Sequence, residues 1–126
     1  MHSGKSERGL GMRLREDTDR TIKEIVENIK VRYRPEKIIL FGSYAYGHPK
    51  EYSDIDLFII KATDKRRIDR FVEVSRLIYE PNYQISVCPL VYTPEELEER
   101  LRLGDVFVKE ILSRGKVLYE RQGQGR

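Results

Sequence analysis

Two short segments of this chain carry residue types that could handle a triphosphate. Gly42 and Ser43 directly follow an apolar run, and after an interval of ten residues Asp54 and Asp56 open a second apolar run. Successive side chains on a strand point to opposite faces, so the two aspartates are expected to point the same way. Two such carboxylates repel each other and resist burial, and a bound divalent cation would remove both costs. The pair therefore predicts a metal site.

The Gly-Ser turn supplies the complementary half of such a site. Glycine lets the backbone approach a ligand closely, because no Cβ stands in the way. Ser43 is expected to cap a short helical turn that runs to about Ala45, and amides at such a turn attract phosphate. Gly47 and Pro49 then return the chain to the second strand. Phosphates held at Gly42 and Ser43 would thus reach a metal held by the aspartates.

These segments must be positioned by a regular succession of helices and short strands. The predicted elements are a helix from Asp17 or Thr18 to the stop at Pro35, strands at about 37–41 and 54–61, a helix at 65–79, a strand at 83–92, helices that start at Thr93 and Asp105, and an extended piece at 116–119. Pro89 places the third strand at an edge or a bulge. The order predicts an α+β fold in which helices flank a small mixed β-sheet.

Length and composition indicate one soluble domain. The chain has 126 residues, of which 36% are charged and 39% apolar. No segment has the length and hydropathy of a membrane helix, and the N-terminus has no apolar signal region. Cys88 stands alone, which excludes a disulfide framework and a cysteine-based zinc site, and it is expected to be a small buried residue. These features predict a cytoplasmic protein that is not associated with a membrane.

The basic character of the chain belongs to its ends. Residues 1–16 and 121–126 each carry a net charge of +2, and taking both from the total of +3 leaves −1 for residues 17–120. Both ends are expected to be flexible tails around a single domain at 17–120. Nucleic acid is therefore only weakly supported as a partner by the charge.

The central motif resembles the signature of the nucleotidyltransferase superfamily that includes DNA polymerase beta, in particular its minimal single-domain bacterial and archaeal members. That signature is an apolar strand, Gly-Ser, about ten residues, and Asp-x-Asp in a second apolar strand. Here these positions are Gly42, Ser43, Asp54 and Asp56. The stretches 91–97 and 115–120 also look like those of such proteins, so the resemblance covers about residues 17–120. It implies a nucleotidyltransferase fold, like the palm of polymerase beta.

The resemblance also implies an activity. Asp54 and Asp56 would be catalytic and would hold one or two Mg²⁺ ions, while Gly42 and Ser43 would bind the β- and γ-phosphates of a nucleoside triphosphate. A nucleoside monophosphate, foremost AMP from ATP, would pass to a hydroxyl of a partner macromolecule. The implied partner is a small helical HEPN-type protein that presents the acceptor, with this chain as the antitoxin of a toxin–antitoxin pair.

The chain departs from the family pattern in two places. Active members carry a third carboxylate on the next strand, whereas the positions here that share one face of that strand are Gln84, Ser86 and Cys88. Glu51, Asp64 and Glu80 could substitute, but none of them lies within the strand. Many relatives also have arginine where this chain has Tyr46, so one positive partner for phosphate is missing.

Two other interpretations stay open. The missing carboxylate favours a catalytically silent module that binds a nucleotide or a partner. A weaker alternative is an accessory domain that binds nucleic acid through the basic tails. The cations Lys65, Arg66, Arg67 and Arg70 could bind phosphates of an acceptor, although such a run at a helix start is also typical of a solvated face. The oligomeric state is left open.

Overall fold

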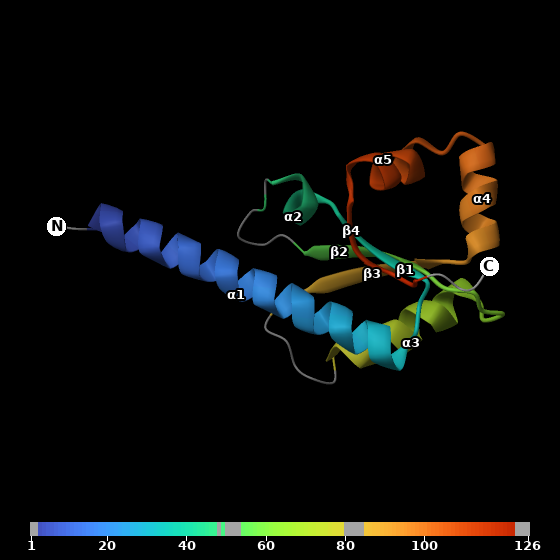
Figure 1. The fold of residues 1–126 in the computed structure, drawn as a ribbon, viewed down its shortest axis with the longest axis horizontal. Coiled ribbons are helices and arrows are strands. Elements are labelled where there is room, and N and C mark those ends of the chain that lie inside the picture. The colour runs from blue at the N-terminus through green and yellow to red at the C-terminus, as the bar shows by residue number, and fades with distance from the viewer. Residues whose placement is uncertain (1–2, 48, 50–53, 80–84, 123–126) are drawn as a thin grey trace.

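The computed structural model describes residues 3–47, 49, 54–79 and 85–122, with residues 3–16 described by their backbone alone. The elements are α1 (Ser3–Arg32), β1 (Lys37–Phe41), α2 (Ser43–Tyr46), β2 (Ile55–Ile60), α3 (Arg67–Tyr79), β3 (Val87–Tyr92), α4 (Pro94–Arg102), α5 (Val106–Arg114) and β4 (Lys116–Glu120). The strands form one sheet in the order β3-β2-β1-β4 (Figure 1). The predicted α+β fold with helices around a small mixed sheet is confirmed.

The register of the sheet brings particular residues together. β1 pairs antiparallel with both β2 and β4, and Phe41 lies opposite Asp56. β2 pairs parallel with β3, and Asp56 is in register with Cys88. β3 is an edge strand, as the position of Pro89 predicted. Asp56 therefore has Phe41 on one side and Cys88 on the other.

Apolar side chains fill both faces of the sheet. Leu57 and Ile59 belong to the core shared with α1 and α3, while Phe58 and Ile60 belong to the core shared with α4 and α5. Figure 1 shows α1 and α3 together on one side of the sheet and α5 on the other. Burial of each such side chain contributes about 1.5–3 kcal/mol. By the same alternation, Asp56 lies on the α4/α5 face.

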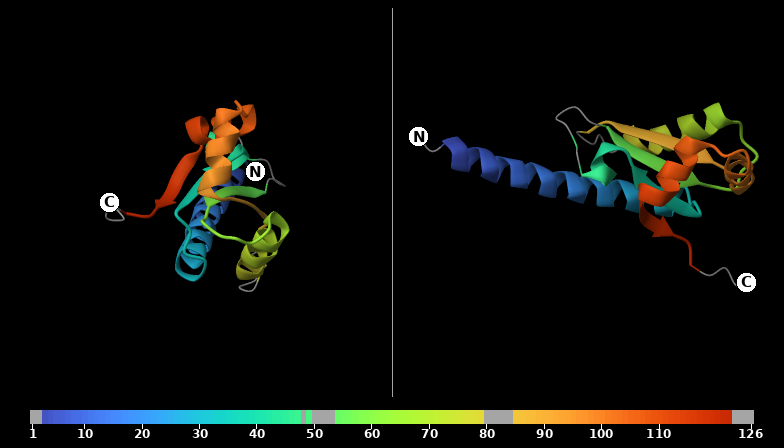
Figure 2. Two further views of the ribbon diagram at one scale, coloured as in Figure 1. Left: turned by 90° about the vertical axis from the view of Figure 1, so that its right-hand side faces the viewer. Right: turned by 90° about the horizontal axis from the view of Figure 1, so that it is seen from above.

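Helix α1 is much longer than the sequence predicted. It begins at Ser3, so the predicted start at Asp17 or Thr18 was wrong. Residues 5–16 contain no proline and consist largely of Lys, Arg, Glu, Leu and Met, which favour helix, and each glycine costs only about 1 kcal/mol. Figures 1 and 2 show this N-terminal part of α1 extending past the sheet. The domain boundary at residue 17 stays a prediction.

The termini of α4 and α5 follow the sequence closely. Thr93 forms a complete capping box with Glu96, and Asp105 caps α5 by accepting a hydrogen bond from the Val108 amide. The Glu96 carboxylate also accepts hydrogen bonds from Nη1 and Nη2 of Arg70, at 2.7 and 3.1 Å. Arg70 is only 6% exposed. It is therefore a buried link between α3 and α4 and takes no part in a solvated basic face.

The C-terminal segment is anchored where the sequence predicted a tail. The Arg121 amide donates to the carbonyl of Glu36 at 2.9 Å, so the chain stays attached one residue beyond β4. Residues 123–126 of the predicted tail lie outside the described residues. In the described part of the chain, no helix has the length and hydropathy needed to cross a membrane.

Candidate functional site

The chain turns at Gly42, between β1 and α2. Gly42 has φ +78° and ψ −161°, and its carbonyl accepts hydrogen bonds from the amides of Ala45 and Tyr46, both at 3.0 Å. This positive φ strongly favours glycine. The prediction that Ser43 caps the turn was wrong, because Gly42 occupies the cap position and Ser43 is the first helical residue. The reversal comes directly after Phe41, the last residue paired with β2, where only glycine adopts the required backbone without strain.

Gly42 and Asp56 are in direct contact. A β-carbon at residue 42 would overlap the carboxylate of Asp56, and the nearest atom would be its Oδ2. The antiparallel pairing of Phe41 with Asp56 creates this proximity. The structure thus brings the predicted phosphate-binding turn and the predicted metal-binding strand together.

The two aspartates occupy different environments. Asp56 is half-buried at the second position of β2, whereas Asp54 is exposed just before the strand begins. Burial and, secondly, the negative charge of Asp54 raise the pKa of the Asp56 carboxyl. Phe41 lies opposite Asp56, and its ring packs edge-on against that of Phe107, with 5.8 Å between the ring centroids. A cation bound between the carboxylates would offset both the burial of Asp56 and its repulsion by Asp54.

The oxygen donors at this position fit a hard divalent cation that also contacts the substrate of the protein. Mg²⁺ is commonly bound by one or two carboxylates together with substrate phosphates, and Asp54 and Asp56 supply two carboxylates beside a glycine turn. Over the described ranges, no group of three or more His, Cys, Asp or Glu side chains is placed to hold a metal ion. Among the described residues, the site therefore offers two carboxylates.

Cys88 occupies the place beside Asp56 on the neighbouring strand. It is exposed, so the prediction of a buried cysteine was wrong, because β3 is an edge strand and Cys88 points to the site end of the α4/α5 face. Partial desolvation of the thiol and, after it, the charges of Asp56 and Asp54 raise the pKa of Cys88. The thiol thus lies close enough to both carboxylates for their negative charge to disfavour the thiolate.

Of the possible substitutes for a third carboxylate, the structure describes only Asp64. Asp64 follows the far end of β2, one strand length from Asp56. Glu51 and Glu80 lie outside the described residues, as do Gln84 and His48. Across residues 85–92, which include the whole of β3, there is no acidic side chain.

A cation from α5 lies over the ring of Tyr46. The Arg114 guanidinium lies 4.1 Å from the centroid of the Tyr46 ring and is also paired with Glu110 at 3.1 Å. Arg114 is the last residue of α5, which precedes β4, and β4 pairs with β1. The sequence did not predict this contact, because the two residues are far apart in the chain and nothing in their local pattern links them.

Comparison with known proteins identifies the family. The family model described as nucleotidyltransferase domain matches residues 22–118, which include the turn and both aspartates. The chain belongs to the nucleotidyltransferase domain family of the polymerase beta superfamily. The family resemblance expected from the central motif is thus confirmed.

Sequence relatives of this nucleotidyltransferase domain occur in Methanocaldococcus jannaschii. One, named as a candidate protein adenylyltransferase, is 40% identical over 87 residues, which are 67% of this chain and 58% of the relative. A second protein with the same kind of name is 34% identical over 104 residues, 80% of this chain and 97% of that protein. The chain thus spans little more than half of the first relative and nearly all of the second.

A solved structure shares the fold. The crystal structure of a candidate nucleotidyltransferase from Sulfolobus solfataricus matches with a TM-score of 0.57 and 23% sequence identity. The match covers 81% of this chain and 79% of that one. At this identity the similarity supports the nucleotidyltransferase fold and nothing finer.

Proposed function

We propose that this domain transfers AMP from ATP to a hydroxyl group of a partner protein. The observation that carries the proposal is the contact between the Gly42 backbone and the Asp56 carboxylate, beside Asp54, in a chain of the nucleotidyltransferase family. The names of the relatives, as candidate protein adenylyltransferases, support ATP as donor and a protein as acceptor.

In the proposed reaction, the acceptor oxygen forms a bond to the α-phosphorus of ATP. The bond from that phosphorus to the oxygen bridging to the β-phosphate breaks, pyrophosphate leaves, and the hydroxyl proton passes to water. Such a displacement requires positioning and charge stabilisation more than covalent help from the protein. The residues described above provide a turn for the phosphates and two carboxylates for a cation.

The residues at the turn have separate tasks in this proposal. The backbone of Gly42 and Ser43 binds the β- and γ-phosphates, because the first amides of α2 have no acceptor within the helix. Asp54 and Asp56 would hold one or two Mg²⁺ ions. A bound Mg²⁺ supplies charge stabilisation to the triphosphate and the attacking oxygen. Arg114 adds a positive charge beside α2, where many relatives carry arginine in the turn itself.

The acceptor is expected to come from another protein. The first candidate we would test is a small helical HEPN-type protein, with this chain as its antitoxin, on the strength of the motif resemblance. The purified domain is incubated with α-labelled ATP, MgCl₂ and the partner encoded beside it. Label on a hydroxyl side chain of the partner, located by mass spectrometry, is the expected result.

Matched variants make this experiment specific. Asp54→Asn and Asp56→Asn should each abolish labelling, whereas Asp64→Asn, which alters an exposed aspartate beyond the far end of β2, should leave labelling unchanged. Chelation of Mg²⁺ should abolish it as well. Equal labelling by wild type and by both site variants would disprove the proposal.

A second candidate function is a silent binding module, and Cys88 favours it. This residue stands in register with Asp56, on the strand that carries an acid in active relatives, so the described part of the site has two carboxylates in place of three. In that case the partner binds equally well to wild type and to Asp56→Asn, and no label is transferred by either. Calorimetry of the complex and the labelling assay together distinguish the two functions.

A further inference from the structure

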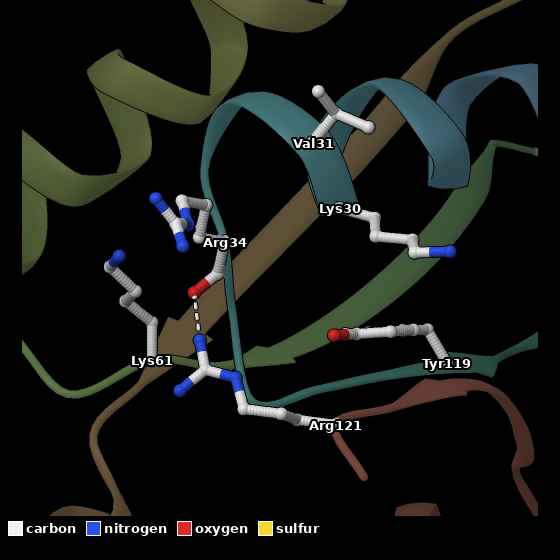
Figure 3. A pocket seen from close by; sticks show the side chains of 6 residues that line it. All are labelled: Lys30, Val31, Arg34, Lys61, Tyr119 and Arg121. Atoms are coloured by element: carbon white, nitrogen blue, oxygen red, sulfur yellow. Dashed lines mark hydrogen bonds between the residues drawn. The ribbon is translucent and has the colours of Figure 1, made fainter.

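A second concave site lies at the opposite end of the central strands. Its volume is about 610 Å³, and it is lined by Lys30, Val31, Arg34, Lys61, Tyr119 and Arg121 (Figure 3). That volume falls within the range usual for small-molecule pockets. Lys37 pairs with Ile60 and Glu120 at this end of β1, whereas Phe41 pairs with Asp56 at the other. The pocket is therefore about 15 Å from the aspartates, the length of five strand residues.

Neutral backbone carbonyls hold two of the four cations of this pocket in place. Lys61 Nζ donates to the Tyr33 carbonyl at 2.7 Å and lies 4.9 Å from the centroid of the Tyr33 ring. Arg121 Nη2 donates to the Arg34 carbonyl at 2.6 Å (Figure 3). A carbonyl orients a cation without cancelling its charge. The charges of Lys61 and Arg121 are therefore fixed in position and stay available to a ligand.

Two of the three nearby carboxylates contact groups outside the pocket lining, and the third lies near Lys30. Glu120 lies 3.7 Å from Lys37 Nζ, and Glu36 accepts a hydrogen bond from the Ala62 amide at 3.2 Å. Glu27 lies 3.8 Å from Lys30, at the distant edge of ion-pair range. By contrast, Arg102, an exposed cation on α4, forms an ion pair at 2.6 Å with Glu99 of the same helix. The pocket lining thus contains four positive charges and no acidic side chain.

We propose that this pocket binds an oligophosphate chain, either free or carried by a nucleotide. Four cations from the end of α1, the end of β2 and the segment after β4 surround one small concavity. An oligophosphate concentrates several negative charges within a few ångströms, which is the distribution that such a cluster complements. The Tyr119 hydroxyl points toward the Arg121 guanidinium and adds a hydrogen-bonding group to the same side of the pocket (Figure 3).

The same details argue against a nucleic acid strand as the ligand. Single-strand binding sites combine a basic groove with free aromatic faces on which bases stack. Here Lys30 Nζ lies 5.5 Å from the centroid of the Tyr119 ring and covers one face of that ring. The four cations also surround one concavity and do not follow an extended groove.

The test measures binding of tripolyphosphate by calorimetry. The full chain carries Asp54→Asn and Asp56→Asn and is kept in EDTA, so that the outcome does not depend on the proposed transfer activity. Arg121→Gln and Arg34→Asn should each weaken binding about tenfold, the usual loss for one charge-assisted contact. Asparagine tolerates the left-handed backbone of Arg34, whose φ is +57°, so that variant keeps the turn. Arg102→Gln, on α4, is the matched control and should bind as the parent does.

Parallel titrations with ATP and with a ten-nucleotide RNA distinguish the possible sources of the bound phosphate groups. Equal affinities for tripolyphosphate and ATP, both weakened about tenfold in Arg121→Gln, support a site for the phosphate chain alone. Tighter binding of ATP with the same loss supports a nucleotide as the natural source. No binding of either ligand, or binding unaffected by Arg121→Gln and Arg34→Asn, would overturn the proposal. RNA binding that depends on these residues without tripolyphosphate binding would overturn it in favour of a nucleic acid site.

Discussion

The backbone of Gly42 lies against the Asp56 carboxylate so closely that no β-carbon fits between them. This contact joins the two halves of the candidate site, the turn that follows β1 and the carboxylates at the start of β2. It exists because β1 and β2 pair antiparallel with Phe41 opposite Asp56. A change at either residue should therefore affect both phosphate binding and metal binding.

Replacement of Gly42 by alanine should remove ATP-dependent labelling and destabilise the fold. Gly104→Ala is the matched control, because Gly104 also has φ +78° but nothing beyond its own chain neighbours lies within 4 Å of the place a β-carbon would take. Each variant should lose about 1–2 kcal/mol for a left-handed alanine, and Gly42→Ala should lose more through overlap with Asp56. Urea denaturation and the labelling assay measure the two effects. Equal stability of the two variants, with labelling intact in Gly42→Ala, would contradict the contact.

Replacement of Asp56 by asparagine should abolish labelling while stabilising the metal-free protein. Burial and Asp54 raise the pKa of Asp56 in the folded state, so the folded protein binds a proton more readily than the unfolded chain. The charged form is then unfavourable at neutral pH, and its removal should gain about 0.5 kcal/mol after allowance for solvent screening. This gain should shrink as the pH falls through the raised pKa of Asp56. Thermal melts of both proteins between pH 3 and pH 8, about the range in which carboxyl groups titrate, measure it. A loss of stability at neutral pH would refute the electrostatic assignment.

Introduction of aspartate at position 88 should raise the activity of this domain. Cys88 is in register with Asp56, so Cys88→Asp adds a carboxylate beside the pair. A third acidic ligand should strengthen metal binding and increase the labelling rate by about tenfold or more. It should also lower the stability of the metal-free protein through added repulsion. Cys88→Ser is the control and should change neither. Unchanged labelling and metal affinity in Cys88→Asp would show that this position does not belong to the metal site.

Removal of the Arg114 charge should weaken ATP binding. Its guanidinium lies over the Tyr46 ring beside the turn proposed to bind phosphate, so Arg114→Gln should raise the KM for ATP by about threefold to tenfold and change kcat little. The double variant with Tyr46→Arg should recover part of the loss, because it restores a cation to the turn. Arg102→Gln is the remote control. A KM unchanged by Arg114→Gln would assign Arg114 a packing role only.

Loss of the Glu96 charge should reduce stability in a manner that depends on pH. The hydrogen bond from Arg70 is the main cause that lowers the pKa of Glu96, so this carboxylate stabilises the fold above its ordinary pKa, and the contribution disappears as the pH falls through the lowered value. Glu96→Gln should cost about 1 kcal/mol at pH 7, since one charge-assisted link is lost and the capping geometry is kept. Glu99→Gln, in an exposed pair with Arg102, should cost less than about 0.5 kcal/mol. Equal effects in the two variants would show that the Arg70–Glu96 link adds nothing beyond a surface pair.

The sequence by itself determined the local parts of this protein. The five residues of β1, the capping box at Thr93, the cap at Asp105 and the edge position indicated by Pro89 all follow from propensities and hydrogen-bonding rules that act over a few residues. The family motif was readable for the same reason. Its glycine and serine directly follow β1, and its aspartates lie at the start of β2, the next strand in the chain.

Only the tertiary structure decided which distant residues meet. Strand register placed Asp56 between Phe41 and Cys88, and helix packing brought Arg114 to Tyr46 and Arg70 to Glu96. These contacts depend on the pairing of segments far apart in the chain, which no local period or propensity specifies. The sequence also did not predict the N-terminal part of α1. Its glycines and charged residues are typical of a flexible tail, whereas in the structure its backbone continues the helix. The motif thus predicted the type of reaction, and the packing of the strands and helices around it determined which side chains lie at the candidate site.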